Sequence, residues 1–199
     1  EFVSLDKIES VLLKKKSWIE SKLKEKSQNF QIQPARQFIS GESVYLFGVQ
    51  YYLKVVEDNC FKVKKDFDRL IFHMEDTSKS KEVITKWLQG EFSHIVNLKS
   101  AECLTHFLKH FDLPVKPVIK IRKMSKRWGS CTSDGIIHLN PMLVAAPIEC
   151  IEYVIYHELA HLIEFDHGEE FYRVLERVCP GFKQIKINLD KSILSINQN

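Results

Sequence analysis

Two histidines and a glutamate in the run Tyr153 to Phe171 have the types and spacing of a metal site with its own general base. His157 and His161 are four residues apart, so on a helix both lie on one face and can direct ring nitrogens at one zinc ion, about 2.0–2.1 Å away. Glu158 lies at the flank of that face, where its carboxylate can reach a metal-bound water molecule without binding the ion. Because zinc lowers the pKa of such a water toward about 7, we expect Glu158 to act as general base.

A catalytic zinc needs three protein ligands and one open position, so the pair requires a third donor. His167 and Glu164 are the candidates. On a straight helix His167 would lie about 9 Å along the axis from His161, too far to share an ion, so it can bind only if the chain turns at residues 165–166. Asp166 and Gly168 favour such a turn, and an amphipathic pattern restarts after them. Glu164, three residues after His161, stays open as the alternative ligand, or as a hydrogen-bond acceptor for a ligand imidazole.

The histidine pair requires a helix, and the residues around it have the period of one. At about 100° per residue the run divides into an apolar face and an opposite face that carries the histidines. The apolar face holds Ile148, Ile151, Ile155, Leu159 and Leu162. The opposite face holds Cys150, Val154, His157, His161 and Glu164. We therefore expect one face to pack against the core and the other to bind the ion, with Pro147 at the first helical position.

The elements before this helix read as strands. The run from Pro117 alternates as a strand, and the segments 128–131 and 136–139 form a predicted hairpin around an Asp134-Gly135 turn. His138 lies in the second of these strands and could face the site. Positive charge gathers just before the hairpin, at Lys120, Arg122, Lys123, Lys126 and Arg127.

The N-terminal part changes period twice. Residues 5–26 predict an amphipathic surface helix, and residues 41–74 predict an antiparallel meander of about four strands. A polar connector at 77–81 leads to one long helix or two shorter ones over 84–111. The expected class is α+β, with residues 1–78 holding the helix and meander and residues 79–199 holding the catalytic core, or with both parts forming one continuous domain.

Composition excludes several classes of protein. Of 199 residues 44% are hydrophobic and 28% charged, with a net charge of +3, which is typical of an ordinary globular chain. Five scattered cysteines without a CxxC pair argue against a disulfide framework and a cysteine-based zinc site. No signal peptide and no apolar run near 18 residues is visible, so we expect a cytoplasmic protein without a membrane partner.

At this point the residues resemble the YgjP-like metallopeptidase family, which is related to the SprT and WLM groups. The resemblance is carried by Arg127-Trp128-Gly129-Ser130-Cys131, Leu139-Asn140, Ala146-Pro147, Tyr153-Val154, HELAHL, His167 and Phe171, and more loosely by KKKSWIE, SGESVYLFG and Lys86 to Leu88. It implies a zinc-dependent hydrolase of zincin type, with a minimal core of a small antiparallel sheet, an active-site helix and following helices. It also implies His157, His161 and His167 as ligands and Glu158 as base. The chain departs from the family at Pro141 and Gly168, neither of which is a ligand.

The resemblance also suggests that Arg127, Trp128, Gly129 and Ser130 line or support the substrate cleft, since zincins pair an extended peptide with a strand edge near the metal helix. The alternative is structural: Trp128 in the core, Gly129 permitting a close helix approach and Arg127 in an ion pair.

Three functions fit these residues. The first is a peptidase acting on a peptide or protein, with Tyr153, Tyr156, Arg127 or His138 as donor to the oxyanion. The second is a nucleotide or phosphoanhydride hydrolase, for which the basic residues before the hairpin would have to converge on the zinc. The third is a nucleic-acid-associated protease that uses the same basic stretch to hold DNA or RNA.

Overall fold

The structure is a computed structural model that describes residues 9–10, 13–17, 20 and 36–196. The chain divides into two compact units, residues 1–35 and 36–199. The helix expected over residues 5–26 lies largely outside the described residues, and the few that are described there are helical. The boundary expected between residues 78 and 79 falls within the second unit and stays a prediction.

The first sheet has four strands, in the order β1-β2-β4-β3. These are β1 Ser43–Leu46, β2 Val49–Glu57, β3 Lys62–Asp66 and β4 Arg69–Met74. β1 pairs antiparallel with β2, and β3 antiparallel with β4, but β2 and β4 run parallel, so the expected antiparallel meander is wrong in this pairing. The side chains explain the order. β4 buries Leu70, Phe72 and Met74 and needs a central place, whereas β3 is rich in charge and suits an edge.

The turn between β1 and β2 joins this sheet to the rest of the unit. Phe47 and Gly48 both have positive φ, and their amides donate to the carbonyls of Val144 and Ala145. A Cβ at Gly48 would lie 2.7 Å from the ring of Pro147, so only glycine allows this close approach. The hairpin tip therefore contacts the chain just before the helix that carries His157 and His161 begins.

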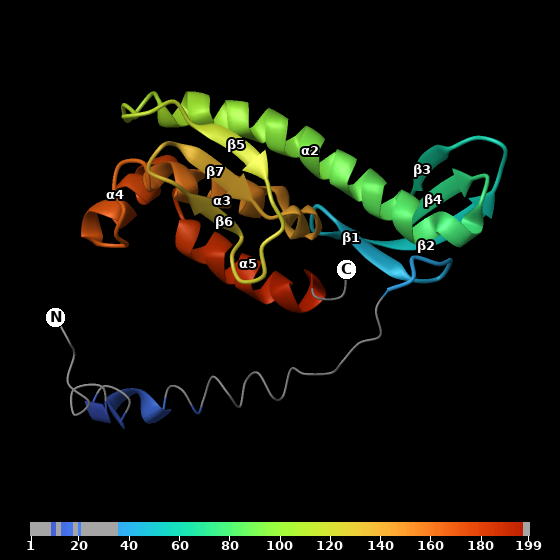
Figure 1. Cartoon of the computed structure of the whole chain (residues 1–199), viewed down its shortest axis with the longest axis horizontal. Helices are drawn as coiled ribbons and strands as arrows, with labels where there is room; N and C mark the ends of the chain where they lie inside the picture. The colour runs from blue at the N-terminus through green and yellow to red at the C-terminus, as the bar shows by residue number, and fades with distance from the viewer. Residues whose placement is uncertain (1–8, 11–12, 18–19, 21–35, 197–199) are drawn as a thin grey trace. The chain divides into compact units, whose positions relative to one another are not determined.

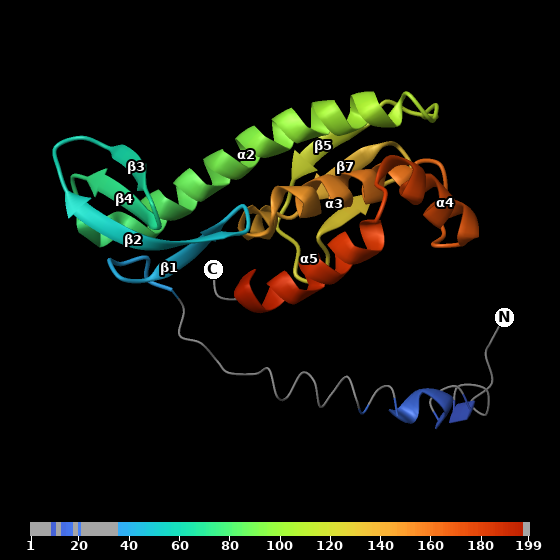
Figure 2. The same cartoon turned by 180° about the vertical axis from the view of Figure 1, so that it is seen from behind.

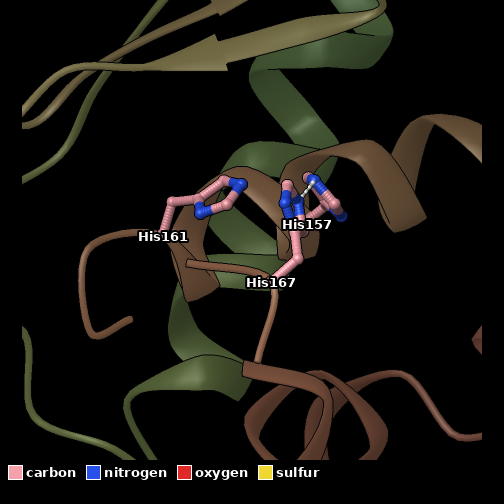
Figure 3. A group of neighbouring side chains, drawn as sticks. All are labelled: His157, His161 and His167. Atoms are coloured by element: carbon pink, nitrogen blue, oxygen red, sulfur yellow. Dashed lines mark hydrogen bonds between the residues drawn. The ribbon is translucent and has the colours of Figure 1, made fainter. Parts of the chain in front are cut away.

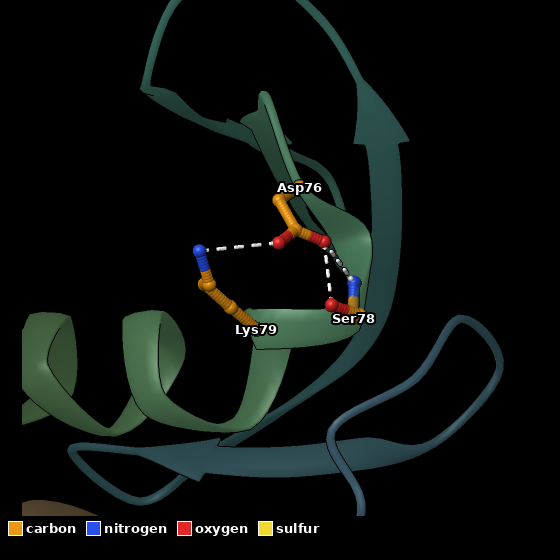
Figure 4. A network of polar contacts seen from close by, with 3 residues as sticks. All are labelled: Asp76, Ser78 and Lys79. Atoms are coloured by element: carbon orange, nitrogen blue, oxygen red, sulfur yellow. Dashed lines mark hydrogen bonds and ion pairs between the residues drawn. The ribbon is translucent and has the colours of Figure 1, made fainter.

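A single long helix, α2 Ser80–Phe107, follows the sheet in place of two shorter ones. It is preceded by a 3-10 turn, Thr77–Lys79, which Asp76 caps by accepting from the amide of Ser78 at 3.0 Å and pairing with Lys79 at 3.3 Å (Figure 4). Figure 1 shows α2 running along the unit, from the four-stranded sheet at one end to the second sheet at the other.

The second sheet has three strands in the order β5-β7-β6. These are β5 Val118–Ile121, β6 Gly129–Cys131 and β7 Ile136–Leu139. The hairpin expected between β6 and β7 is confirmed, with Gly135 at a φ of 86° in its turn. β5 and β7 are parallel, so the sheet is mixed where it was expected to be antiparallel. β7 occupies the centre because Ile137 and Leu139 are fully buried, which leaves β6 at an edge.

The remaining helices complete the α+β class that the sequence predicts. They are the 3-10 helix η2 Pro141–Ala145, α3 Ile148–Ala160, α4 Glu169–Val178 and α5 Phe182–Ile196. α3 packs against α2, α4, α5 and β6, and Figure 2 shows it in the middle of the unit with α2 and α5 on either side.

The division of α3 into a packing face and a binding face is wrong in the N-terminal half of the helix. Cys150, on the expected binding face, is as buried as Ile151 on the other, and α5 packs on it, with Sγ of Cys150 3.9 Å from the carbonyl oxygen of Ile185. The C-terminal half opens to a cavity, which Tyr153, Val154, His157 and Glu158 line. Within the described residues, no helix has both the length and the apolar character that crossing a bilayer requires.

Candidate metal centre

The chain leaves the helix directly after the first two histidines. α3 ends at Ala160, and His161 is its C-cap residue. The amides of Leu162 and Ile163 then donate to carbonyls three residues back, at 3.1 and 3.0 Å, which tightens the final turn. α4 begins after Gly168, so the reversal expected at 165–166 is present but starts several residues earlier. It brings His167 back toward the end of α3.

The three histidines converge on one point, as Figure 3 shows. Each offers one ring nitrogen, and these three nitrogens lie within 4.8 Å of one another. Nε2 of His167 is 3.1 Å from Nε2 of His157, so these two rings face each other directly. Nδ1 of His161 lies 3.1 Å from the carbonyl oxygen of Glu164, to which it donates, and this leaves its Nε2 with a free lone pair. Glu164 thus contacts the histidines through its backbone carbonyl rather than through its carboxylate.

The donor set fits a zinc ion. In a tetrahedral zinc site with bonds near 2.05 Å, neighbouring donor nitrogens lie about 3.3 Å apart, close to the separation of the His157 and His167 nitrogens. Burial, followed by the charges of His161 and His167, lowers the pKa of His157 to about 3, so its ring stays neutral. Burial also lowers the pKa of His161. Neutral imidazoles are the form that binds a cation.

Nδ1 of His157 is buried and has no hydrogen-bond partner among the described residues. Its ring also packs against Phe171, whose ring centroid is 5.0 Å away. Phe171 contacts all three histidine rings, which gives this α4 residue a part in the site that its apolar character alone does not reveal.

Glu158 lies beside the histidines and is 5% exposed. Burial raises the pKa of its carboxyl group to about 7, and the positive charge of Arg127 opposes this shift. The carboxylate lies against β6 at Gly129, where a Cβ would come within 2.5 Å of Oε1. Gly129 therefore leaves the space that the carboxylate fills, which is the close helix approach that its sequence position suggested.

One cavity of about 460 Å³ joins these groups. All four predicted cleft residues line it, namely Arg127, Trp128, Gly129 and Ser130, together with the three histidines and Glu158. Phe165 and Leu189 also line it and were missed. Leu189 comes from α5, and nothing local in the sequence connects that helix to the motif.

The four candidate oxyanion donors separate into two groups. Tyr153 and Arg127 line the cavity, whereas Tyr156 and His138 do not. Burial raises the pKa of Tyr153 to about 12, so its hydroxyl stays protonated and able to donate. Tyr156 lies against α2 instead, with its ring 5.9 Å from that of His106.

The basic stretch before the hairpin does not converge on the site. Lys120, Arg122, Lys123 and Lys126 are exposed and none lines the cavity, so Arg127 alone reaches it. Dispersed charge of this kind favours a peptide site over phosphate chemistry. All five cysteines are free thiols in the structure.

Comparisons with known proteins indicate a family for this chain. A family model described as YgjP-like, metallopeptidase domain, matches residues 1–192. The search of curated proteins returns no match. Among solved structures, the metallopeptidase zymogen of Pyrococcus abyssi abylysin is similar, with 26% identity over 52% of this chain and 97% of that chain and a TM-score of 0.42.

Proposed function

This chain belongs to the YgjP-like metallopeptidase family, and on that premise we propose that it is a zinc-dependent peptidase whose ion is held by His157, His161 and His167. The observation that carries the proposal is the meeting of three histidine nitrogens, within 4.8 Å of one another, with a buried carboxylate in one cavity. Three nitrogen donors with a fourth position open to a cavity are what a catalytic zinc requires.

The histidines bind through defined nitrogens in this proposal. His161 is held by its Nδ1 hydrogen bond to Glu164, so Nε2 is its ligand atom, and the facing Nε2 atoms of His157 and His167 supply the other two. When bound, zinc would polarise the scissile carbonyl and lower the pKa of a water molecule toward about 7.

Glu158 is the proposed general base. A carboxyl group with a pKa of about 7 can take a proton from water near neutral pH and return it to the departing amine nitrogen. Gly129 allows Oε1 to lie against the strand without a clash, and the surrounding core keeps bulk water from the carboxylate. Tyr153 is the proposed donor to the oxyanion, because Tyr153 lines the cavity and its hydroxyl stays protonated.

β6 supports a peptide as the substrate. It is the outer strand of its sheet, and Gly129, Ser130 and Cys131 all line the cavity, so an extended peptide could add to its open edge while its carbonyl reaches the histidines. A nucleic-acid partner stays a prediction for the exposed residues of the basic stretch, to be tested by a mobility shift with single-stranded DNA.

Three variants test the proposal. The full chain is loaded with zinc, its metal content is measured by mass spectrometry, and hydrolysis of a mixed peptide library is followed. We expect about one zinc per chain in the wild type and in Glu158→Gln, and none in His161→Ala, with hydrolysis lost in both variants. His94→Ala, an exposed histidine on α2, is the matched control and should keep both metal and activity. Hydrolysis retained by Glu158→Gln refutes the assigned base, and cleavage of pyrophosphate or nucleotides instead of peptides refutes the substrate class.

A further inference from the structure

One positively charged side chain in the cavity, Arg127, has no assigned contact with a substrate, and its only stated effect is to oppose the rise in the pKa of Glu158. Arg127 is the one lysine or arginine among the described residues that line the cavity. Its side chain is exposed and makes no ion pair with any described residue, unlike Arg173, which pairs with Glu170, or Lys99, which bridges Glu102 and Glu152. The alternative role of Arg127 as a structural ion-pair partner is therefore unsupported within the described chain.

The backbone that carries Arg127 is firmly held. Asn140 is 2% exposed, and its Nδ2 donates to the carbonyls of Met124 at 2.7 Å and Arg127 at 2.9 Å. The amide of Asn140 also donates to the carbonyl of Trp128 at 2.8 Å. A long side chain that starts from a fixed backbone loses less freedom when it binds a ligand, so Arg127 is suited to recognition.

Arg127 also lies next to the strand edge to which a peptide substrate would add. It lies two residues before Gly129, the first residue of the edge strand β6. A peptide added to that edge would pass its side chains along the same cavity wall. A guanidinium there can hold a carboxylate through two parallel hydrogen bonds, and it repels lysine or arginine in the same position.

We propose that Arg127 is a specificity-determining residue that selects peptides carrying a carboxylate close to the scissile bond. The inference rests on the proposed peptidase function and names its substrate class. The carboxylate can come from an aspartate or glutamate side chain or from the peptide's C-terminus, since the same guanidinium fork recognises both.

Matched peptides test the proposal by turnover. A neutral parent peptide, blocked at both ends, receives Glu, Gln or Lys in turn at each of the positions flanking the cleaved bond, and a second arm compares free with amidated C-termini. We expect one position, or the free C-terminus, to raise kcat/KM about tenfold over the neutral peptide, mainly through KM. Arg127→Gln should bring that ratio close to one, and Arg127→Glu should move the preference to Lys. Arg122→Gln, which changes an exposed arginine outside the cavity, should keep the wild-type ratio.

Binding provides a readout that does not need turnover. Zinc-loaded Glu158→Gln is titrated with fluorescent acidic and neutral peptides, and the same ratio of about ten in Kd should appear and should vanish when Arg127→Gln is added. If the wild type cleaves no peptide but this ratio is present, the peptidase proposal fails and the carboxylate site stands. An equal fall in kcat for all peptides in Arg127→Gln, or a wild type with no preference in either assay, overturns the inference.

Discussion

Replacing Glu158 with glutamine should stabilise the metal-free protein at alkaline pH while abolishing catalysis. The carboxyl group has its pKa raised from 4.5 to about 7 by burial, so the folded state prefers it protonated. The cost of ionising it is therefore absent below the unfolded pKa, grows as the pH rises from 4.5 to about 7, and is complete above that. A shift of about 2.5 units at about 1.4 kcal/mol each amounts to about 3 kcal/mol. Glutamine has nearly the same shape and carries no charge, so it avoids this cost.

Urea unfolding of chelator-treated protein measures the effect. We expect Glu158→Gln to raise the unfolding free energy by about 3 kcal/mol near pH 8 and by close to zero near pH 4.5. His157 has a lowered pKa and destabilises both proteins below about pH 6.5, where the unfolded chain takes up the proton, so its contribution cancels in the difference. Glu149→Gln, an exposed glutamate in the first turn of the same helix, is the control and should lower the free energy by less than about 1 kcal/mol. A gain that is equal at both pH values, or a loss at pH 8, would show that burial does not govern this carboxylate.

Two further substitutions test how the site is held. Gly129→Ala places a methyl group against Oε1 of Glu158, so kcat should fall by at least about a hundredfold while metal content stays at the wild-type level. Activity within threefold of wild type would contradict the close approach of Glu158 to Gly129. Asn140→Asp replaces the Nδ2 donor by an oxygen that faces the carbonyls of Met124 and Arg127. The unfolding free energy should therefore fall by about 2–3 kcal/mol. An unchanged urea midpoint would show that these two hydrogen bonds do not hold the backbone of Arg127.

The cluster of three histidines was predictable because its parts are close together in the chain. His157 and His161 are related by the helix period alone, and Asp166 and Gly168 indicated a turn that would bring back His167, although the helix ends earlier, at Ala160. The hairpin of β6 and β7 follows equally from its Asp134-Gly135 turn. Each of these features depends on a few neighbouring residues and needs no knowledge of the rest of the fold.

The predictions that were wrong concern features that depend on residues far away in the sequence. The parallel pairing of β2 with β4 reflects competition between strands for the centre of a sheet, which the alternation within one strand does not encode. Cys150 is buried because α5 lies across it, and Leu189 of α5 reaches the cavity for the same reason. Where a helix returns to pack decides which residues share a cavity, and periodicity along one segment carries no information about it.

The three proposed metal ligands come from one uninterrupted peptide, residues 157–167, while the walls that would meet a substrate come largely from β6 before it and α5 after it. Under the proposed function, ion capture and substrate choice are encoded in separate stretches of the gene. Mutation would then remodel which substrates the enzyme accepts without disturbing the proposed ligands, and this modularity makes the β6 wall and α5 the natural targets for redesign.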